Sequence, residues 1–175
     1  PKDVLQFVCG PGSVIGSAFV RDPRVAIIAF TGSKPVGLDI LQASGQTPEN
    51  QPFVKKVICE MGGKNAIIID ASADLDEAVL GVRQSAFGYQ GQKCSACSRA
   101  IVVESAHDLF LQRLVESTRT LVVGNVMNPA TDMGPVIDKN AATEIRRYIE
   151  IGSEEGKLEL GEPTPVELEE ETGRD

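Results

Sequence analysis

Short apolar runs alternate along the chain with longer segments in which apolar residues recur every three or four positions. The short runs, expected to be strands, are residues 5–9, 24–30, 54–59, 65–70 and 99–104. Helical spacing begins at Gly12, and occurs again from Thr31 through Leu41, from the capping residues 72–74 to about Gly88, over 107–121 and over 138–152. This alternation is typical of parallel sheets joined by crossover helices. We therefore predict an α/β protein.

The domain organisation follows from two of these runs. Residues 24–30 form the most continuous β-branched run and are expected to be a strand buried on both faces. Further along, the expected strands 54–59 and 65–70 are separated by Glu60-Met-Gly-Gly63. Paired glycines tolerate unusual backbone dihedrals, so this break is a candidate hinge. We predict one domain over residues 1–60 and a second over 61–175.

Charge is distributed unevenly over the 175 residues. The chain carries 17 Lys and Arg against 25 Asp and Glu, and residues 153–175 alone hold 2 basic and 9 acidic side chains. We expect this acidic tail to be a solvated surface segment. The content of 42% hydrophobic and 24% charged residues is globular, and no apolar run approaches the ~20 residues of a membrane-spanning helix. Without a basic stripe, neither nucleic acid nor an anionic membrane is an expected partner.

Four cysteines, Cys9, Cys59, Cys94 and Cys97, lie in a chain without a recognisable signal peptide. Cys9 and Cys59 fall in apolar runs, so we expect both to be buried, and we expect all four to be free thiols in a reducing compartment. The cytoplasm is the predicted location, with the mitochondrial matrix as the alternative. Because the chain opens at Pro1 and runs directly into an expected strand, we expect a central fragment of a longer protein.

A candidate anion site follows residues 24–30. Thr31, Gly32 and Ser33 connect this run to a helix that contains Gly37. Free N–H groups and the positive end of the dipole at a helix N-terminus suit a pyrophosphate, and Gly32 would let the backbone approach it closely. The segment is not the GxGxxG fingerprint, and a glycine after a strand is often only a tight turn. Both interpretations stay open on these residues.

A candidate nucleophile, Cys94, lies in the glycine-containing loop from Gly91 to Arg99. Lys93 and Arg99 flank it, and positive charge together with backbone N–H groups favours a thiolate. The alternatives are a metal or redox pair with Cys97 and an inert structural cysteine. A zinc site needs four ligands, and the lone His107 is expected to be a structural residue at the start of a helix, so we predict no metal site.

A carboxylate, Glu60, ends the expected strand 54–59 and lies 34 residues before Cys94. A lone glutamate is usually a solvated charge. The carboxyl end of a parallel strand is nevertheless the position from which α/β proteins present side chains to a ligand crevice. Glu60 is therefore the second candidate catalytic residue.

Three motifs together resemble the aldehyde dehydrogenase superfamily. They are Phe30-Thr-Gly-Ser33 with Gly37, Glu60-Met-Gly-Gly-Lys-Asn65, and Gly91-Gln-Lys-Cys94, in the order and spacing of that family. The resemblance covers essentially the whole chain, and the run from Ser85 to Arg99 is most similar to the branch that acts on glutamate γ-semialdehyde. It implies the end of a Rossmann-like NAD-binding domain, followed by the start of a catalytic domain.

The resemblance also implies a thioester mechanism. Cys94 would attack the aldehyde carbon, hydride would pass to NAD, and Glu60 would activate the water that hydrolyses the acyl-enzyme. Ser95 would help to hold a substrate carboxylate. The residues implied to contact NAD are Gly12, Gly16, Thr31, Gly32, Ser33, Gly37, Met61 and Gly62. We expect NAD-dependent oxidation of glutamate γ-semialdehyde, which is in equilibrium with 1-pyrroline-5-carboxylate, to glutamate.

Parts of that family's machinery have no counterpart in this sequence. The oxyanion-stabilising asparagine, several ribose- and substrate-binding residues and the oligomerisation strand all fall outside it. We therefore expect little activity from the isolated chain and a homo-oligomeric full-length parent acting on a small-molecule aldehyde. Two alternatives stay open, namely a different semialdehyde or aliphatic aldehyde as substrate, and a non-catalytic module that binds a nucleotide or a protein.

Overall fold

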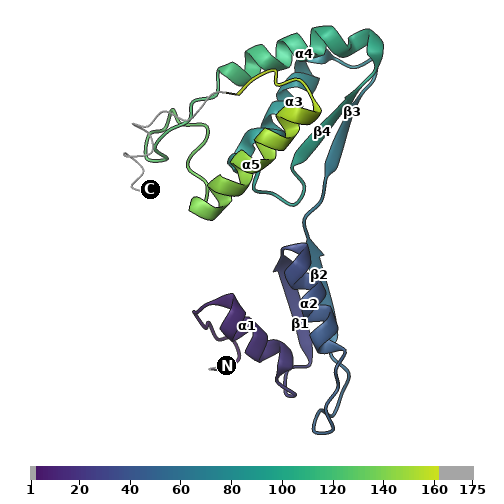
Figure 1. Ribbon diagram of the computed structural model, residues 1–175, viewed down its shortest axis with the longest axis vertical. Coiled ribbons are helices and arrows are strands. Elements are labelled where there is room, and N and C mark those ends of the chain that lie inside the picture. The colour runs from purple at the N-terminus through teal and green to yellow at the C-terminus, as the bar shows by residue number, and fades with distance from the viewer. Residues whose placement is uncertain (1–2, 162–175) are drawn as a thin grey trace. The chain divides into compact units, whose positions relative to one another are not determined.

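The structure is a computed structural model that describes residues 3–161, so most of the expected acidic tail lies outside the described residues. The chain divides into two compact units, the first ending at Gly62 and the second beginning at Gly63 (Figure 1). Each unit is built from helices and a two-stranded parallel sheet, which confirms the predicted α/β class.

The first unit consists of α1 (Gly12–Arg21), β1 (Ile27–Gly32), α2 (Lys34–Ser44) and β2 (Lys56–Met61). The strands β1 and β2 pair in parallel, from Ile27 opposite Lys56 to Gly32 opposite Met61. α2 lies along this sheet (Figure 1). The buried cluster is formed by Val20, Ile40 and Ala43, with Ile28, Phe30, Val57 and Cys59 packed against it.

Several expectations for this unit are wrong. The strand expected over residues 24–30 begins and ends later, and it is covered on one face only, with Ile27 62% exposed. The reason is that α2, with α1 packed against it, covers one face of the sheet and leaves the other open. The strand expected over residues 5–9 is absent, and Leu5 and Phe7 are 95% and 89% exposed, because no neighbouring strand in this unit pairs with it. Cys9, expected to be buried, is exposed as well.

A buried lysine fixes the connection between α1 and β1. Lys55 is only 7% exposed, and its ammonium group donates hydrogen bonds to the carbonyl oxygens of Asp22 and Val25, the second at 2.8 Å. Asp22 is the C-terminal capping residue of α1, so the positive charge also lies at the negative end of the helix dipole. Lys55 thus joins the end of α1 to the start of β2 across about thirty residues of sequence.

Replacing Lys55 by methionine is expected to lower the free energy of unfolding by about 1–3 kcal/mol, because carbonyl oxygens that accept from a buried donor would lose it. Lys56→Met is the matched control, since Lys56 is the adjacent lysine and is exposed. Urea denaturation of the full-length gene product, with hydrogen exchange of the α1 and β1 amides, measures the difference. Equal effects of the two substitutions would exclude a structural role for the Lys55 ammonium.

The same connection contains an ion pair on its surface. The Arg24 guanidinium donates to both oxygens of the Asp22 carboxylate, at 2.9 and 2.6 Å, and the Arg24 backbone N–H donates at 2.9 Å. The side-chain hydrogen bond from Arg24, followed by the backbone one, holds the pKa of Asp22 well below its ordinary value of 3.8. A lowered carboxyl pKa stabilises the fold above that ordinary value, and the contribution disappears as the pH falls toward the lowered one.

Asp22→Asn is therefore expected to lower the melting temperature at neutral pH, with the loss shrinking as the pH is brought below 3.8. Asp39→Asn serves as the control, because it removes one exposed carboxylate from the same unit. Melting temperatures of the three proteins across a pH series provide the measurement. A constant difference between Asp22→Asn and wild type over the whole series would contradict the assignment.

The second unit contains β3 (Asn65–Ile69), α3 (Leu75–Phe87), the 3-10 segment η1 (Gly88–Gly91), β4 (Cys97–Val102), α4 (Glu104–Arg119) and α5 (Lys139–Glu155). β3 and β4 pair in parallel, and α3 and α4 pack on them. Asp74 caps α3 as expected, because its side chain accepts hydrogen bonds from the backbone N–H groups of Asp76 and Glu77.

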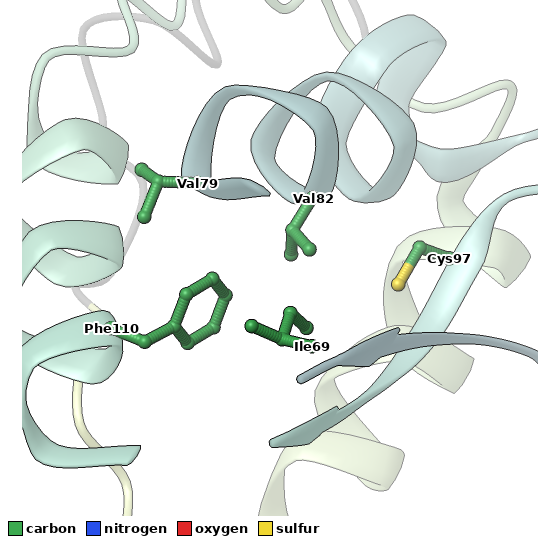
Figure 2. Packing of buried hydrophobic residues seen from close by; sticks show 5 residues of the cluster. All are labelled: Ile69, Val79, Val82, Cys97 and Phe110. Atoms are coloured by element: carbon green, nitrogen blue, oxygen red, sulfur yellow. The ribbon is translucent and has the colours of Figure 1, made fainter. Parts of the chain in front are cut away.

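The core of the second unit lies between α3, α4 and the sheet. Figure 2 shows Phe110 from α4 and Ile69 from β3 facing one another, with Val79 and Val82 entering from α3. Cys97 at the start of β4 completes this cluster and is 7% exposed. Ile69, at 1% exposed, is the most deeply buried of the five. The sheet's other face is open, with Ile68 75% exposed.

Several boundaries differ from the expected ones. β4 begins at Cys97, two residues before the expected strand, because Cys97 pairs with Asn65 and enters the core. α4 begins at Glu104 instead of 107, since its first turn is mostly polar and shows no apolar periodicity. Asp138 caps α5 through its side chain, which accepts from the Ala141 N–H at 2.8 Å. No residue of α5 is buried.

Candidate active site

The candidate nucleophile lies in a tight turn immediately before β4. The backbone N–H of Ala96 donates to the Lys93 carbonyl at 3.2 Å, so Cys94 and Ser95 occupy the two central positions of the turn. Both side chains are exposed. Three residues later, Cys97 points into the core, and its backbone N–H donates to the Ser85 hydroxyl on α3 at 3.1 Å. The turn thus presents one cysteine to solvent and buries the other.

This division separates the two cysteines of the CxxC sequence. The Cys97 thiol is 3.4 Å from the carbonyl oxygen of Arg99, to which it donates, while the Cys94 thiol is exposed, and all four cysteines of the chain are free. Within residues 3–161, no group of three or more histidine, cysteine, aspartate or glutamate side chains is arranged to hold a metal ion. Of these two cysteines, Cys97 therefore has a packing role and Cys94 has the solvent-accessible thiol.

A left-handed backbone segment precedes the turn. Tyr89, Gln90 and Gly91 have φ values of 59°, 55° and 68°. Non-glycine residues with such values cost of order 1–3 kcal/mol each and persist where surrounding contacts impose them. Here the Gln92 N–H donates to the Tyr89 carbonyl at 3.0 Å. With its amide oriented to satisfy both ends, the Gln90 side-chain oxygen accepts from the Gly134 N–H at 2.7 Å. The backbone that leads into the Cys94 turn is therefore held in an uncommon conformation.

The opposite side of the turn is held by the start of β3. The Asn65 side-chain amide donates to the Cys94 carbonyl at 2.8 Å, and the Asn65 carbonyl accepts from the Ser98 hydroxyl at 3.3 Å. Arg99, expected beside a Cys94 thiolate, donates its guanidinium to the Lys64 carbonyl at 2.6 Å. The positive charge of Arg99 is thus engaged with the main chain just before β3, within the second unit.

Glu60 lies where the sequence analysis expected it, near the carboxyl end of β2. It is opposite Thr31 in the parallel register, and both residues are exposed on the open face of the sheet. Met61 is paired with Gly32 and is half-buried. The carboxyl ends of β1 and β2 therefore present Glu60 and Thr31 side by side.

The glycines expected to contact NAD fall into two groups. A side chain at Gly12, Gly16 or Gly62 would meet nothing within 4 Å, so these backbone positions are open to a ligand. At Gly32 a Cβ would lie 2.5 Å from the Phe30 ring, and at Gly37 it would lie 2.6 Å from the Met61 sulfur. A side chain at either position would therefore have to displace one of these two neighbouring side chains. Neither Gly62 nor Gly63 adopts a left-handed φ.

The residues of the first unit fit a pyrophosphate-containing cofactor. Ser33 caps α2 without a side-chain hydrogen bond to the helix, which leaves the hydroxyl and the first-turn N–H groups for an anion. Pro35 at the start of α2 fixes the direction in which the helix begins. The open surfaces at Gly12 and Gly16 on α1 provide room for the rest of such a cofactor.

Two residues with important contacts were not predicted from the sequence. They are Asn65, which contacts Cys94, and Lys55, which contacts the end of α1. Asn65 belongs to one of the three motifs but was given no role of its own. The signal that could have identified it is a polar residue at the first position of an apolar strand. Lys55 gave no signal, because its neighbour Lys56 is exposed and the sequence does not distinguish the two. His107 is exposed in the first turn of α4, 2.9 Å from the Asp108 carboxylate, with no part in the site.

The observations define an α/β protein with a surface-presented thiol before one parallel strand and a carboxylate at the end of another. The chain belongs to the aldehyde dehydrogenase family, whose model matches residues 1–174. Among residues 3–161, no helix is long and apolar enough to cross a membrane.

Curated relatives include the 1-pyrroline-5-carboxylate dehydrogenase of Geobacillus kaustophilus, which is 49% identical over 161 residues, or 92% of this chain and 31% of the relative. The protein of the same name from Bacillus subtilis is 44% identical over the same share of each chain. The chain thus spans about a third of the length of the curated relatives it matches.

Solved structures agree with this family. A 1-pyrroline-5-carboxylate dehydrogenase from Thermus with bound NAD is 43% identical with a TM-score of 0.83, over 87% of this chain and 29% of that one. Proline utilization A from Bdellovibrio bacteriovorus is 46% identical with a TM-score of 0.87, over 89% and 16% of the chains. A betaine aldehyde dehydrogenase from Staphylococcus aureus, in complex with NAD+, is 31% identical with a TM-score of 0.83.

The different environments of Cys94 and Cys97 predict different reactivities. In the native full-length gene product, iodoacetamide is expected to label Cys94 and to leave Cys97 unmodified until the protein is denatured, because Cys97 lies in the core. Peptide mass spectrometry after timed labelling measures both sites in one sample. Equal labelling of the two in the native state would rule out the buried position of Cys97.

Proposed function

We propose that the protein is an NAD-dependent dehydrogenase that oxidises glutamate γ-semialdehyde to glutamate through a thioester on Cys94. The observation that carries this proposal is the exposed thiol in a turn whose backbone is held from both sides, by Asn65 and by the left-handed segment at 89–91. A positioned, accessible thiol is what nucleophilic attack on an aldehyde requires. The names of the relatives support the choice of substrate.

The covalent steps assign a task to each residue. The Cys94 thiol gives up its proton to solvent and its sulfur forms a bond to the aldehyde carbon, while the electron pair of the C=O bond moves to the oxygen, to which the backbone N–H of Cys94 is available. NAD supplies the acceptor for the hydride that leaves this carbon. Glu60 then removes a proton from water as the water attacks the thioester, which releases the carboxylic acid and returns the thiol. Ser95, exposed beside the nucleophile, offers a hydroxyl to the substrate's own carboxylate.

The first unit would hold the cofactor. Thr31, Gly32 and Ser33 lie where β1 meets the N-terminus of α2, Gly37 lets α2 pack closely on Met61, and Gly12 and Gly16 leave the surface of α1 open. The Met61 carbonyl and Gly62 are proposed to border the nicotinamide. In this assignment residues 1–60 complete an NAD-binding domain and residues 61–175 begin a catalytic domain.

Two further proposals concern the setting of the protein. Four free thiols are consistent with a reducing compartment, for which we propose the cytoplasm. We propose a homo-oligomer for the full-length gene product, in line with the family resemblance. Size-exclusion chromatography with light scattering tests the second proposal directly.

Substitutions at the two catalytic residues test the mechanism. In the full-length gene product, Cys94→Ala is expected to reduce NADH formation from glutamate γ-semialdehyde by roughly 10³-fold or more, because no covalent intermediate forms. Glu60→Gln is expected to slow turnover by about 10²- to 10⁴-fold and to leave a rapid initial burst of NADH, since only hydrolysis of the thioester needs the base. Stopped-flow absorbance of NADH measures both.

The controls separate the alternatives. Cys9→Ala removes an exposed thiol outside the proposed site and should leave turnover unchanged. If succinate semialdehyde or an aliphatic aldehyde is turned over faster than glutamate γ-semialdehyde, the proposed mechanism stands and the proposed substrate is wrong. Stabilisation by NAD without NADH formation from any aldehyde would identify a nucleotide-binding module and overturn the proposal.

A further inference from the structure

We propose that Asn65 is a positioning residue for Cys94, whose side-chain amide fixes the carbonyl group of the nucleophile and thereby orients its thiol and its backbone N–H. This inference rests on the proposed role of Cys94. Asn65 does not itself touch the reacting atoms in this assignment. It acts through the peptide group that follows the nucleophile.

The contact has the geometry of a well-formed hydrogen bond. The Asn65 amide nitrogen lies 2.8 Å from the Cys94 carbonyl oxygen, within the usual range for N–H···O bonds. It reaches Cys94 from a residue 29 positions earlier in the chain, outside the turn that contains the nucleophile. Fixing this carbonyl restricts rotation of the peptide plane between Cys94 and Ser95, and so restricts the turn.

Asn65 is itself held in place by the sheet. It is the first residue of β3 and is paired with Cys97, whose side chain is anchored in the core. The next pair along the ladder is Ala66 with Arg99, so Ser98 is an extra residue on β4 and forms a β-bulge. Bulges re-aim side chains, and are common next to active sites. The Ser98 hydroxyl donates to the Asn65 carbonyl at 3.3 Å, which ties the bulge to the residue that holds Cys94.

A glycine packs against this contact. A Cβ added at Gly63 would lie 3.3 Å from the Asn65 amide nitrogen and 3.5 Å from the Cys94 carbonyl oxygen. The first of these distances is tight, so a side chain there would press on the amide that reaches Cys94. Gly63 has no left-handed φ to explain it, and the space needed by the Asn65–Cys94 contact supplies a physical reason. The absence of a side chain at Gly63 thus leaves room for the Asn65–Cys94 hydrogen bond.

The test compares Asn65→Ala and Asn65→Asp with wild type in the full-length gene product. Misplacing a reacting group by about 1 Å can cost around 10²-fold, so we expect kcat to fall 10- to 100-fold in both variants. The KM for NAD and the labelling of Cys94 by iodoacetamide should stay close to wild type, because neither cofactor site nor thiol is removed. Asn140→Ala, an exposed asparagine on α5, is the matched control and should retain full activity.

Asn65→Asp adds a readout that a merely structural role would not change. Its carboxylate would repel the Cys94 carbonyl when ionised and donate a hydrogen bond to it when protonated, so the pKa of the introduced carboxyl is expected to be raised. The ratio of variant to wild-type kcat should therefore rise as the pH is lowered toward about 5. The corresponding ratio for Asn65→Ala should be independent of pH.

The outcomes distinguish this inference from the proposed function. Wild-type kcat in both Asn65 variants, with Cys94→Ala inactive, would overturn the positioning role and leave the dehydrogenase assignment intact. A parallel loss of NAD affinity, Cys94 labelling and melting temperature, without the pH-dependent recovery, would show a general structural role and overturn it too. Absence of Cys94-dependent activity in wild type would overturn the proposed function, and the inference with it.

Discussion

The burial of Cys97 beneath α3 is the constraint on which the candidate active site depends. Because its side chain completes the cluster around Ile69 and Phe110, the start of β4 cannot shift along the sheet without moving an apolar group out of the core. The three residues before it must then leave the sheet in a turn, and this turn presents Cys94. A packing requirement therefore determines where a chemically reactive group lies.

The sequence predicted the class of fold and the order of elements well, for physical reasons that particular residues illustrate. The β-branched run that ends at Phe30 and the capping side chain of Asp74 express local preferences, and both elements form. Residues 5–9 have an equally apolar pattern and form no strand, because a strand requires a pairing partner that composition does not reveal. Local pattern thus predicts the propensity for a strand, whereas pairing decides its existence.

The sequence supplies candidate residues for the site but not the contacts that support them. Cys94 and Glu60 are candidates from sequence motifs, and the structure places Cys94 in the turn before β4 and Glu60 near the end of β2, both exposed. The support of Cys94 comes from Asn65, 29 residues away, and from a β-bulge at Ser98 that has no sequence signature. The glycines were ambiguous because their neighbours in space come from other parts of the chain, so the sequence does not show whether a glycine serves packing or a cofactor. Gly32 lies against the Phe30 ring and Gly37 against the Met61 sulfur, neighbours that the sequence alone does not reveal.

The uncovered faces of the two small sheets have a practical consequence for production of the protein. Ile58 of β2 and Ile101 of β4 are 55% and 53% exposed, each on the face of its sheet that the helices leave bare. Exposed β-branched apolar faces with unpaired strand edges favour association between chains. We therefore expect residues 3–161, expressed without a covering partner, to associate through these faces.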